Sequence, residues 1–347
     1  MKPHAERAVS EAAESETTMR LADVFCDRMV LQAHAPIRFF GEGTGTVRVD
    51  FDGEEQAVQS NGKWIVTMRS RPYGGPYTVT VEMNGQRTVL KEVYVGETVL
   101  CAGQSNMAFC MAEESTPTED YESDSLLRTF AVTRPVSHES FSSRDGWQLC
   151  RKESVFRWSA IGYHLGRALR RAYDCAVGVI VCAQGASVIQ SWVDAKTNAL
   201  PCFCFPEGTV RHVDHTYYAD AGFNAPAFLY HAMAESLFPF SFGRAVWYQG
   251  ESNTSVAEAE RYTEMLRALI RLWRQKDENE TLPFYVVQIA DTFDTPEWKR
   301  LQQAQKEAED PKDGIFVIKS GDACEKGKIH PPGKKALAER IFDQMNR

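Results

Sequence analysis

The 347-residue chain lacks three features that mark particular classes of protein. No cluster of lysine and arginine stands out and the net charge is −8, so we expect no nucleic-acid partner, because phosphate binding requires such clusters. No apolar run reaches the roughly 18 residues of a membrane-spanning helix, so we expect no membrane partner. The first 25 residues contain no apolar core of the signal-peptide type. These absences predict a cytoplasmic protein, with a secreted mature form that has lost its signal as the alternative.

The cysteine and histidine spacing offers no disulfide framework and no metal motif. Nine cysteines are an odd number and only Cys202 and Cys204 lie close together, so we expect reduced thiols. His212 and His215 form the stretch HVDH, but neither an HExxH motif nor paired cysteines accompany them. We therefore expect no metal ion. The sequence predicts no particular oligomeric state.

Residues 19–92 have the composition of short β-strands. Runs rich in β-branched and aromatic residues lie at 37–41, 47–51, 64–68, 77–83 and 87–90. Pairs that tolerate the positive φ angles of two-residue hairpins lie between them, namely Asp52-Gly53, Asn61-Gly62 and Asn84-Gly85. We predict a small antiparallel β-sandwich domain over 19–92, preceded by a flexible polar tail over 1–18.

After Val93, apolar runs alternate with helical patterns. The runs typical of buried parallel strands lie at 95–104, 176–185, 243–250, 282–290 and 313–321. Residues 159–173 and 255–275 have helical periodicity, and the second segment carries one apolar stripe from Val256 to Trp273. This alternation predicts an α/β domain over 93–347, with a doubly wound parallel sheet flanked by helices.

Small and polar residues gather where the predicted strands end. Ligands of doubly wound sheets bind at the carboxyl ends of the strands, so these residues are the candidates for a site. They are Gly103 to Asn106, Gln184 to Ser187, Gln249 to Asn253, Gln288 and the segment that leads to His330. At three of these strand ends a glycine comes shortly before a polar residue. A sheet with a purely structural role has little reason to repeat this arrangement.

Ser105, in the stretch GQSNM after the first of these strands, has two interpretations. As an N-cap it would satisfy a backbone N–H of the following helix. As a nucleophile it would need a base for its proton and donors for an oxyanion. The candidate donors at strand ends are the N–H of Ser105, Gly185, and Gln249 with Gly250 and Glu251.

His330 is the histidine best placed to act as the base. It lies in the stretch KIHPPGKK, between the last predicted strand and the final helix, where Pro331 and Pro332 restrict the backbone. A rigid loop above the last strand is well placed to face Ser105. The other histidines lie in the tail, the predicted sandwich, a helix or polar loops.

These blocks together resemble the sialate O-acetylesterase family within the SGNH hydrolases. VGETVLCAGQSNM is similar to the nucleophile block of that family, VGVIVCAQGASVIQSW to its glycine-loop block and AVWYQGESN to its third block. LPFYVVQ and IHPPGKKALAERI complete the series in the right order, and the segment from Leu21 to about residue 82 resembles the family's N-terminal β-sandwich. The resemblance extends from about Leu21 to the C-terminus.

The resemblance implies a serine esterase that removes O-acetyl groups from sugars, with an O-acetylated sialic acid as substrate and partner. It implies Ser105 as nucleophile and His330 as general base. It also implies an oxyanion hole made by the N–H groups of Ser105 and Gly185 and by the segment that begins at Gln249. No metal or organic cofactor is implied.

The sequence departs from the family pattern just before His330. Family members usually carry an aspartate two or three residues before the histidine, where this chain has Lys328 and Gly327. The acid that orients His330 is therefore expected among Asp322, Glu325 and Glu251, or a backbone carbonyl takes its place. Replacing an orienting aspartate by the amide costs about 10⁴ in kcat in a known triad, so weak activity is one expectation.

The resemblance also suggests which residues contact the substrate. The candidates are Gln104, Asn106, Trp192, Gln249 and Glu251. His231 stands where the family commonly has asparagine. Two alternatives to sialate O-acetylesterase activity stay open: deacetylation of xylan or another polysaccharide, and a weakly active or non-catalytic glycan-binding protein.

Overall fold

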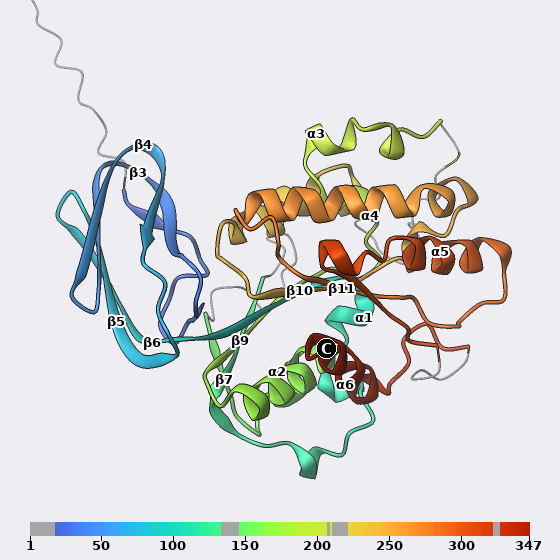
Figure 1. The fold of residues 1–347 in the computed structure, drawn as a ribbon, viewed down its shortest axis with the longest axis horizontal. Helices are drawn as coiled ribbons and strands as arrows, with labels where there is room; N and C mark the ends of the chain where they lie inside the picture. Colours follow the sequence, from blue (N-terminus) through green and yellow to red (C-terminus); the bar gives the residue numbers. More distant parts are fainter. Residues whose placement is uncertain (1–17, 133–145, 207–208, 210–220, 322–326) are drawn as a thin grey trace, which may run out of the picture.

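The computed structural model describes residues 18–132, 146–206, 209, 221–321 and 327–347. In these residues the chain forms a mixed α/β fold with a large sheet at its centre (Figure 1). The strands are β1 (Arg20–Leu21), β2 (Val30–Gln32), β3 (Ile37–Phe51), β4 (Glu54–Met68), β5 (Gly74–Met83), β6 (Gln86–Gly103), β7 (Asp124–Ala131), β8 (Gln148–Cys150), β9 (Val177–Ala183), β10 (Arg244–Tyr248), β11 (Phe284–Val287) and β12 (Ile315–Ile318). The α-helices are α1 (Ser105–Ala108), α2 (Ala160–Tyr173), α3 (Ala195–Asn198), α4 (Val256–Lys276), α5 (Pro296–Glu307) and α6 (Lys334–Met345).

Six parallel strands form the central sheet, in the order β7-β9-β6-β10-β11-β12. The short strand β8 pairs antiparallel with β7 at one edge. The chain passes from β6 to β7 and β9 on one side and then to β10 on the other side. The end of β6 is therefore the point where the strand order reverses, which is where ligands bind in such sheets.

Both faces of the central sheet are covered by helices. Figure 1 shows α4 and α5 on one side of the sheet and α2 and α6 on the other. Along β10, Ala245 and Trp247 pack in the cluster that contains the α4 stripe, whereas Val246 and Tyr248 pack in the cluster that contains α2 and α6. This alternation follows from the two-residue period of a strand, and burial of both faces explains why three of the five predicted strands are nearly continuously apolar.

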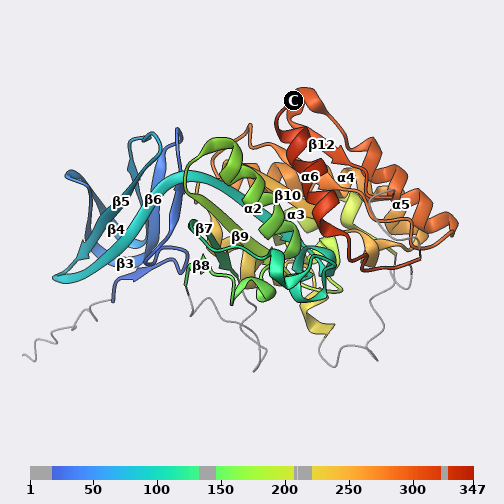
Figure 2. The same cartoon turned by 90° about the horizontal axis from the view of Figure 1, so that it is seen from below.

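Strand β6 joins the N-terminal strands to the central sheet. It pairs with β5 and β2 over its first part and with β9 and β10 over its second part, and Figure 2 shows it running between the two regions. The predicted boundary between residues 92 and 93 therefore lies inside a strand. A register shift between β5 and β6 falls at this point, and Glu92 has a φ of 55° there. The change from the strand-and-turn pattern to the strand-and-helix pattern in the sequence therefore coincides with this register shift in β6.

One predicted hairpin turn is wrong. Asp52-Gly53 and Asn84-Gly85 do join β3 to β4 and β5 to β6, with positive φ at all four residues. Asn61-Gly62 instead lies within β4, where Asn61 pairs with Thr44 and Gly62 with Gly43 of β3. The long β3–β4 pairing overrides the local turn preference of this dipeptide.

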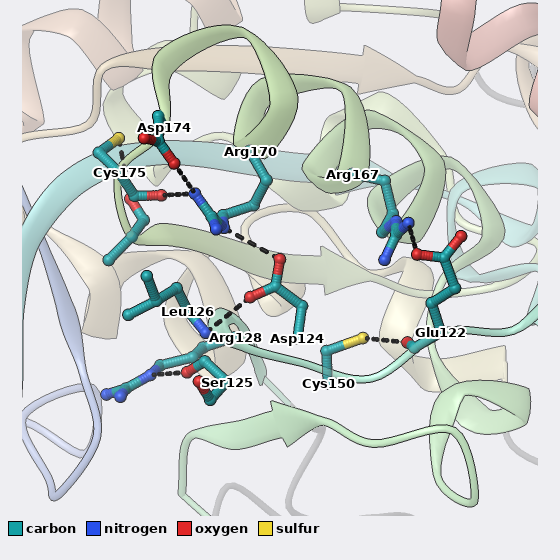
Figure 3. Close-up of polar contacts among 11 residues, drawn as sticks. Glu122, Asp124, Ser125, Leu126, Arg128, Cys150, Arg167, Arg170, Asp174 and Cys175 are labelled. Carbon is teal, nitrogen blue, oxygen red and sulfur yellow. Dashed lines mark hydrogen bonds and ion pairs between the residues drawn. The ribbon is translucent and has the colours of Figure 1, made fainter.

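Ion pairs and hydrogen bonds attach the C-terminal half of α2 to the segment around β7 (Figure 3). Nε of Arg170 lies 3.0 Å from Oδ2 of Asp124, and its Nη1 donates to the carbonyl oxygen of Cys175 at 2.8 Å. Arg167 pairs with Glu122. The side chain of Arg170 is only 15% exposed, so these contacts are partly shielded from water.

Replacing Arg170 with methionine is expected to lower the free energy of unfolding by about 1–3 kcal/mol, because charge-assisted bonds to a carboxylate and a carbonyl are lost. The matched control is Arg171→Met, which removes the same charge from an exposed position in the same helical turn. Urea denaturation measures both variants. Equal stability of the two proteins would contradict the prediction.

Candidate active site

Ser105 is held at the carboxyl end of β6 by the backbone before it. Gly103 has a φ of 139°, and a Cβ atom there would lie 2.1 Å from the carbonyl oxygen of Tyr248 on β10. The N–H of Gln104 donates to that same oxygen at 2.9 Å. The N-cap of α1 is Gln104, with no side-chain capping bond, so Ser105 is the first helical residue and not the cap.

The structure brings His330 to Ser105. Nε2 of His330 lies 2.8 Å from Oγ of Ser105, although the two residues are 225 positions apart. The histidine belongs to the exposed segment between β12 and α6, and its ring lies beside Phe109, with 6.3 Å between the ring centroids. In the neutral imidazole Nε2 can accept the Ser105 hydroxyl proton, which is the contact that nucleophile activation requires.

The segment that carries His330 is anchored on both sides of the histidine. Nδ2 of Asn106 donates to the carbonyl oxygen of Ile329 at 2.8 Å. Oγ1 of Thr292 donates to the carbonyl oxygen of Lys328 at 3.0 Å. The N–H of Ser115 donates to the carbonyl oxygen of Pro332 at 3.4 Å. Backbone anchors from three separate segments therefore set the position of the histidine.

Two effects hold the pKa of His330 below its ordinary value. Partial burial of the ring is the larger, because it disfavours the charged form, and the positive charge of Lys334 acts in the same direction. The carboxylate of Glu113 opposes them. The net direction favours the neutral imidazole, which is the form that can take a proton.

Of the three predicted orienting acids, the structure describes only Glu251. Asp322 and Glu325 lie outside the described residues, so they stay predictions. Glu251 is buried and accepts a hydrogen bond from Nδ2 of Asn106 at 2.6 Å. Burial raises the pKa of Glu251, against the opposing effects of Asn106 and Lys334. Within the described parts of the chain, no carboxylate oxygen lies within 4.0 Å of a His330 nitrogen.

The side-chain amides of Gln249 and Gln104, two of the predicted site residues, form hydrogen bonds within the protein. Nε2 of Gln249 donates to the carbonyl oxygen of Ser187 at 2.9 Å and to Oδ1 of Asn253 at 2.8 Å, so both amide protons of this buried side chain are committed. Oε1 of Gln104 accepts the N–H groups of Gly250 and Ser252 at 3.3 and 3.4 Å. Both side-chain amides therefore bond within the protein, and the two N–H groups of the Gln249 amide bond to Ser187 and Asn253.

Gly185 and Trp192 occupy different environments after β9. Gly185 is half-buried in the loop that follows the strand, next to the positive φ of Ala186. Trp192 is 0% exposed, donates to Oγ of Ser187 at 2.9 Å and packs edge-on against Trp247. Gly185 therefore lies near the strand ends, whereas Trp192 lies in the core with no part of its side chain exposed.

His231 lies away from Ser105. It belongs to a π-helix (Tyr230–Ala234), and its Nδ1 lies 2.8 Å from Oε2 of Glu235. It lines a cavity of about 640 Å³ together with Phe40 and Trp64 of the N-terminal strands and with Pro239, which precedes β10. This cavity lies where β10 begins, whereas Ser105 lies where the strands end.

A buried polar network behind the site was missed by the sequence reasoning. Nδ2 of Asn253 donates to Oε1 of Glu258 and Oε1 of Gln190, each at 2.8 Å. Oγ of Ser255 donates to Oε2 of Glu258 at 2.6 Å and accepts the N–H of the same residue. The signal was present, because a serine three residues before a glutamate is a capping box. The network holds the segment after β10 in place.

Neither a metal site nor a membrane span emerges from the described residues. They contain no group of three or more histidine, cysteine, aspartate or glutamate side chains arranged to hold a metal ion. His212 and His215, the one stretch that suggested a metal, lie outside the described residues. No described helix has both the length and the apolar character to cross a membrane.

Three comparisons relate the chain to known proteins. Human sialate O-acetylesterase is 26% identical over 369 residues, which cover 93% of this chain and 69% of the human protein. The rat sialate O-acetylesterase is 25% identical, covering 93% and 72% of the two chains. A carbohydrate acetylesterase from Xanthomonas citri has a similar solved structure, with a TM-score of 0.78, 27% identity and 94% and 74% coverage.

The chain also matches a model of a protein family. Residues 95–347 match the family described as carbohydrate esterase, sialic acid-specific acetylesterase. This match covers the central sheet, the segment that carries Ser105 and the segment that carries His330. The chain therefore belongs to the sialic acid-specific acetylesterase family of carbohydrate esterases and is a carboxylic ester hydrolase.

Proposed function

We propose that this protein hydrolyses O-acetyl esters of sialic acid through a Ser105 acyl-enzyme intermediate, with His330 as general base and acid. The observation that carries the proposal is the 2.8 Å contact between His330 Nε2 and Ser105 Oγ. The names of the mammalian relatives support sialic acid as the substrate. The proposed fold is that of an SGNH hydrolase with an N-terminal β-sandwich.

The proposed reaction has two halves. His330 takes the Ser105 proton as Oγ attacks the acetyl carbonyl carbon, and the oxyanion is held by the N–H groups of Ser105 and Gly185. The N–H of Ser105 is free of intrahelical bonding because it lies in the first turn of α1. His330 then donates its proton to the departing sugar hydroxyl. Water repeats these steps on the acetyl-enzyme and releases acetate.

The substrate is tested by comparing acetate release from O-acetylated sialic acid and from acetylated xylan at equal ester concentration. The Ser105→Ala protein serves as the blank. We expect a higher kcat/KM for the acetylated sialic acid. A higher value for acetylated xylan would instead support a polysaccharide acetylesterase. Glycan binding without acetate release from any ester would overturn the catalytic proposal.

The pH dependence of kcat/KM should report the state of His330. Only the neutral imidazole can take the serine proton, so activity should fall as the pH drops through the histidine pKa. Because burial and Lys334 lower that pKa, we expect the acidic limb to lie below pH 6.5, the ordinary value. Hydrolysis of p-nitrophenyl acetate between pH 4.5 and 8 measures it. An acidic limb above pH 7 would contradict the assignment.

A further inference from the structure

A lysine is buried beside the Ser105–His330 pair. Lys334 is the first residue of α6 and is 0% exposed. Its Nζ donates to Oδ1 of Asn106 at 2.6 Å and lies 4.9 Å from the ring centroid of Phe109 and 5.3 Å from that of Tyr248. Burial of an ammonium group is costly unless hydrogen bonds and negative charge compensate for it. A buried lysine at this position therefore needs an explanation.

Asn106 joins three parts of the protein. It is 0% exposed, accepts from Lys334, and donates through Nδ2 to Oε1 of Glu251 at 2.6 Å and to the carbonyl oxygen of Ile329 at 2.8 Å. The amide orientation is fixed by its partners, because a lysine ammonium can only donate and a backbone carbonyl can only accept. We call the three side chains and the Ile329 carbonyl the Asn106 bridge.

The Asn106 bridge connects the residue after Ser105 to the residue before His330. The carbonyl oxygen of Ile329 is held by Asn106, so any shift of Asn106 moves the backbone on which His330 stands. Lys334 donates to the amide oxygen of Asn106 and so keeps Nδ2 directed at Glu251 and Ile329. If this donor were lost, the amide oxygen of Asn106 would lose the partner that fixes it, and the hydrogen bond to Ile329 would be held less firmly.

Among the residues that the structure describes, charged side chains from four segments lie around His330. Lys334 approaches from α6, Glu113 from the turn after α1, Glu251 from the turn after β10, and Lys328 lies on the histidine's own segment. Of these, Lys334 lowers and Glu113 raises the histidine pKa. Lys334 thus acts on His330 both through the Asn106 bridge and through its charge.

We propose that Lys334 is a positioning residue, which holds His330 in place against Ser105 through its hydrogen bond to Asn106. This inference rests on the proposed Ser105–His330 chemistry. It assigns to a buried lysine and a backbone tether part of the task that an aspartate before the histidine performs in other family members.

The test replaces Lys334 with methionine, which has a similar shape but neither charge nor donor. We expect kcat for p-nitrophenyl acetate to fall about 10- to 100-fold, the scale of a misplaced catalytic group, with KM changed less than about two-fold. We also expect the acidic limb of the pH profile to move to higher pH, because a cation near His330 is gone. The shift of the limb reports the charge of Lys334, and the fall in kcat at a nearly unchanged KM reports its positioning of His330.

The matched control is Lys335→Met, which removes an exposed lysine from the next position of α6 and should leave both kcat and the pH limb unchanged. Lys334→Gln, which keeps a donor without the charge, serves if Lys334→Met does not fold, and the shifted limb is expected there too. An unshifted limb and a normal kcat in the folded Lys334 variants would overturn the inference. The Ser105→Ala protein separates this failure from a failure of the proposed function, because its activity tests only the latter.

Discussion

Replacing Ser105 with alanine is expected to lower kcat for acetyl ester hydrolysis by about 10⁶-fold, as in known serine hydrolases in which the nucleophile is removed. The alanine side chain has no oxygen to form the acyl-enzyme, and the His330 ring loses the partner that lies 2.8 Å from its Nε2. The residual rate would come from the oxyanion donors and from substrate binding alone. Acetate release measured at high enzyme concentration gives the rate.

The same experiment should include His330→Ala and the double variant. Because the two side chains act as one unit, the kcat of the double variant should lie within a few-fold of the kcat of Ser105→Ala. Both positions are partly exposed, so we expect all three variants to fold. Circular dichroism checks this. Wild-type turnover in Ser105→Ala would show that another residue is the nucleophile.

Replacing Gly103 with alanine is expected to lower the free energy of unfolding by about 2–6 kcal/mol. The φ of 139° costs an L-residue about 1–3 kcal/mol. A Cβ atom would also lie 2.1 Å from the Tyr248 carbonyl oxygen, and relieving such an overlap costs about 1–3 kcal/mol more. That relief displaces the end of β6, so kcat should fall together with stability.

The matched control is Gly53→Ala, at the turn between β3 and β4. Gly53 also has a positive φ, of 82°, but nothing lies within 4 Å of the Cβ position. The control therefore contains the backbone cost of a positive φ without the contact with Tyr248. Urea denaturation and kcat are measured for both variants. If Gly53→Ala were as destabilised as Gly103→Ala, the steric argument would fail.

Local patterns predicted most of the secondary structure correctly. The apolar stripe became the buried face of α4 from Ala259 to Trp273, whereas its first predicted member, Val256, is 56% exposed. The apolar runs became strands covered on both faces. These signals succeed because the period of a helix or strand is a local property of the chain. The turn predicted at Asn61-Gly62 was wrong for the opposite reason, since these two residues pair with Thr44 and Gly43 of β3, which are 17 and 19 positions away.

The environment of a side chain at a strand end was not predictable in the same way. Gln249 and Trp192 belong to segments that lead into the site, yet Gln249 bonds to Ser187 and Asn253, and Trp192 packs in the core. Sequence position indicates that a residue lies near the carboxyl end of a strand. It does not indicate whether its side chain points toward Ser105 or into the protein, because that depends on neighbours from other strands.

By itself the sequence determined the α/β alternation, the strand ends where a site would form, and Ser105 and His330 as the residues to examine. Only the tertiary structure decided the 2.8 Å contact between them and the place of Lys334 in the Asn106 bridge. The reason is physical. Strand and helix periods arise from neighbours along the chain, whereas the position of His330 depends on hydrogen bonds from Asn106 and Thr292, which are distant in sequence and adjacent only after folding.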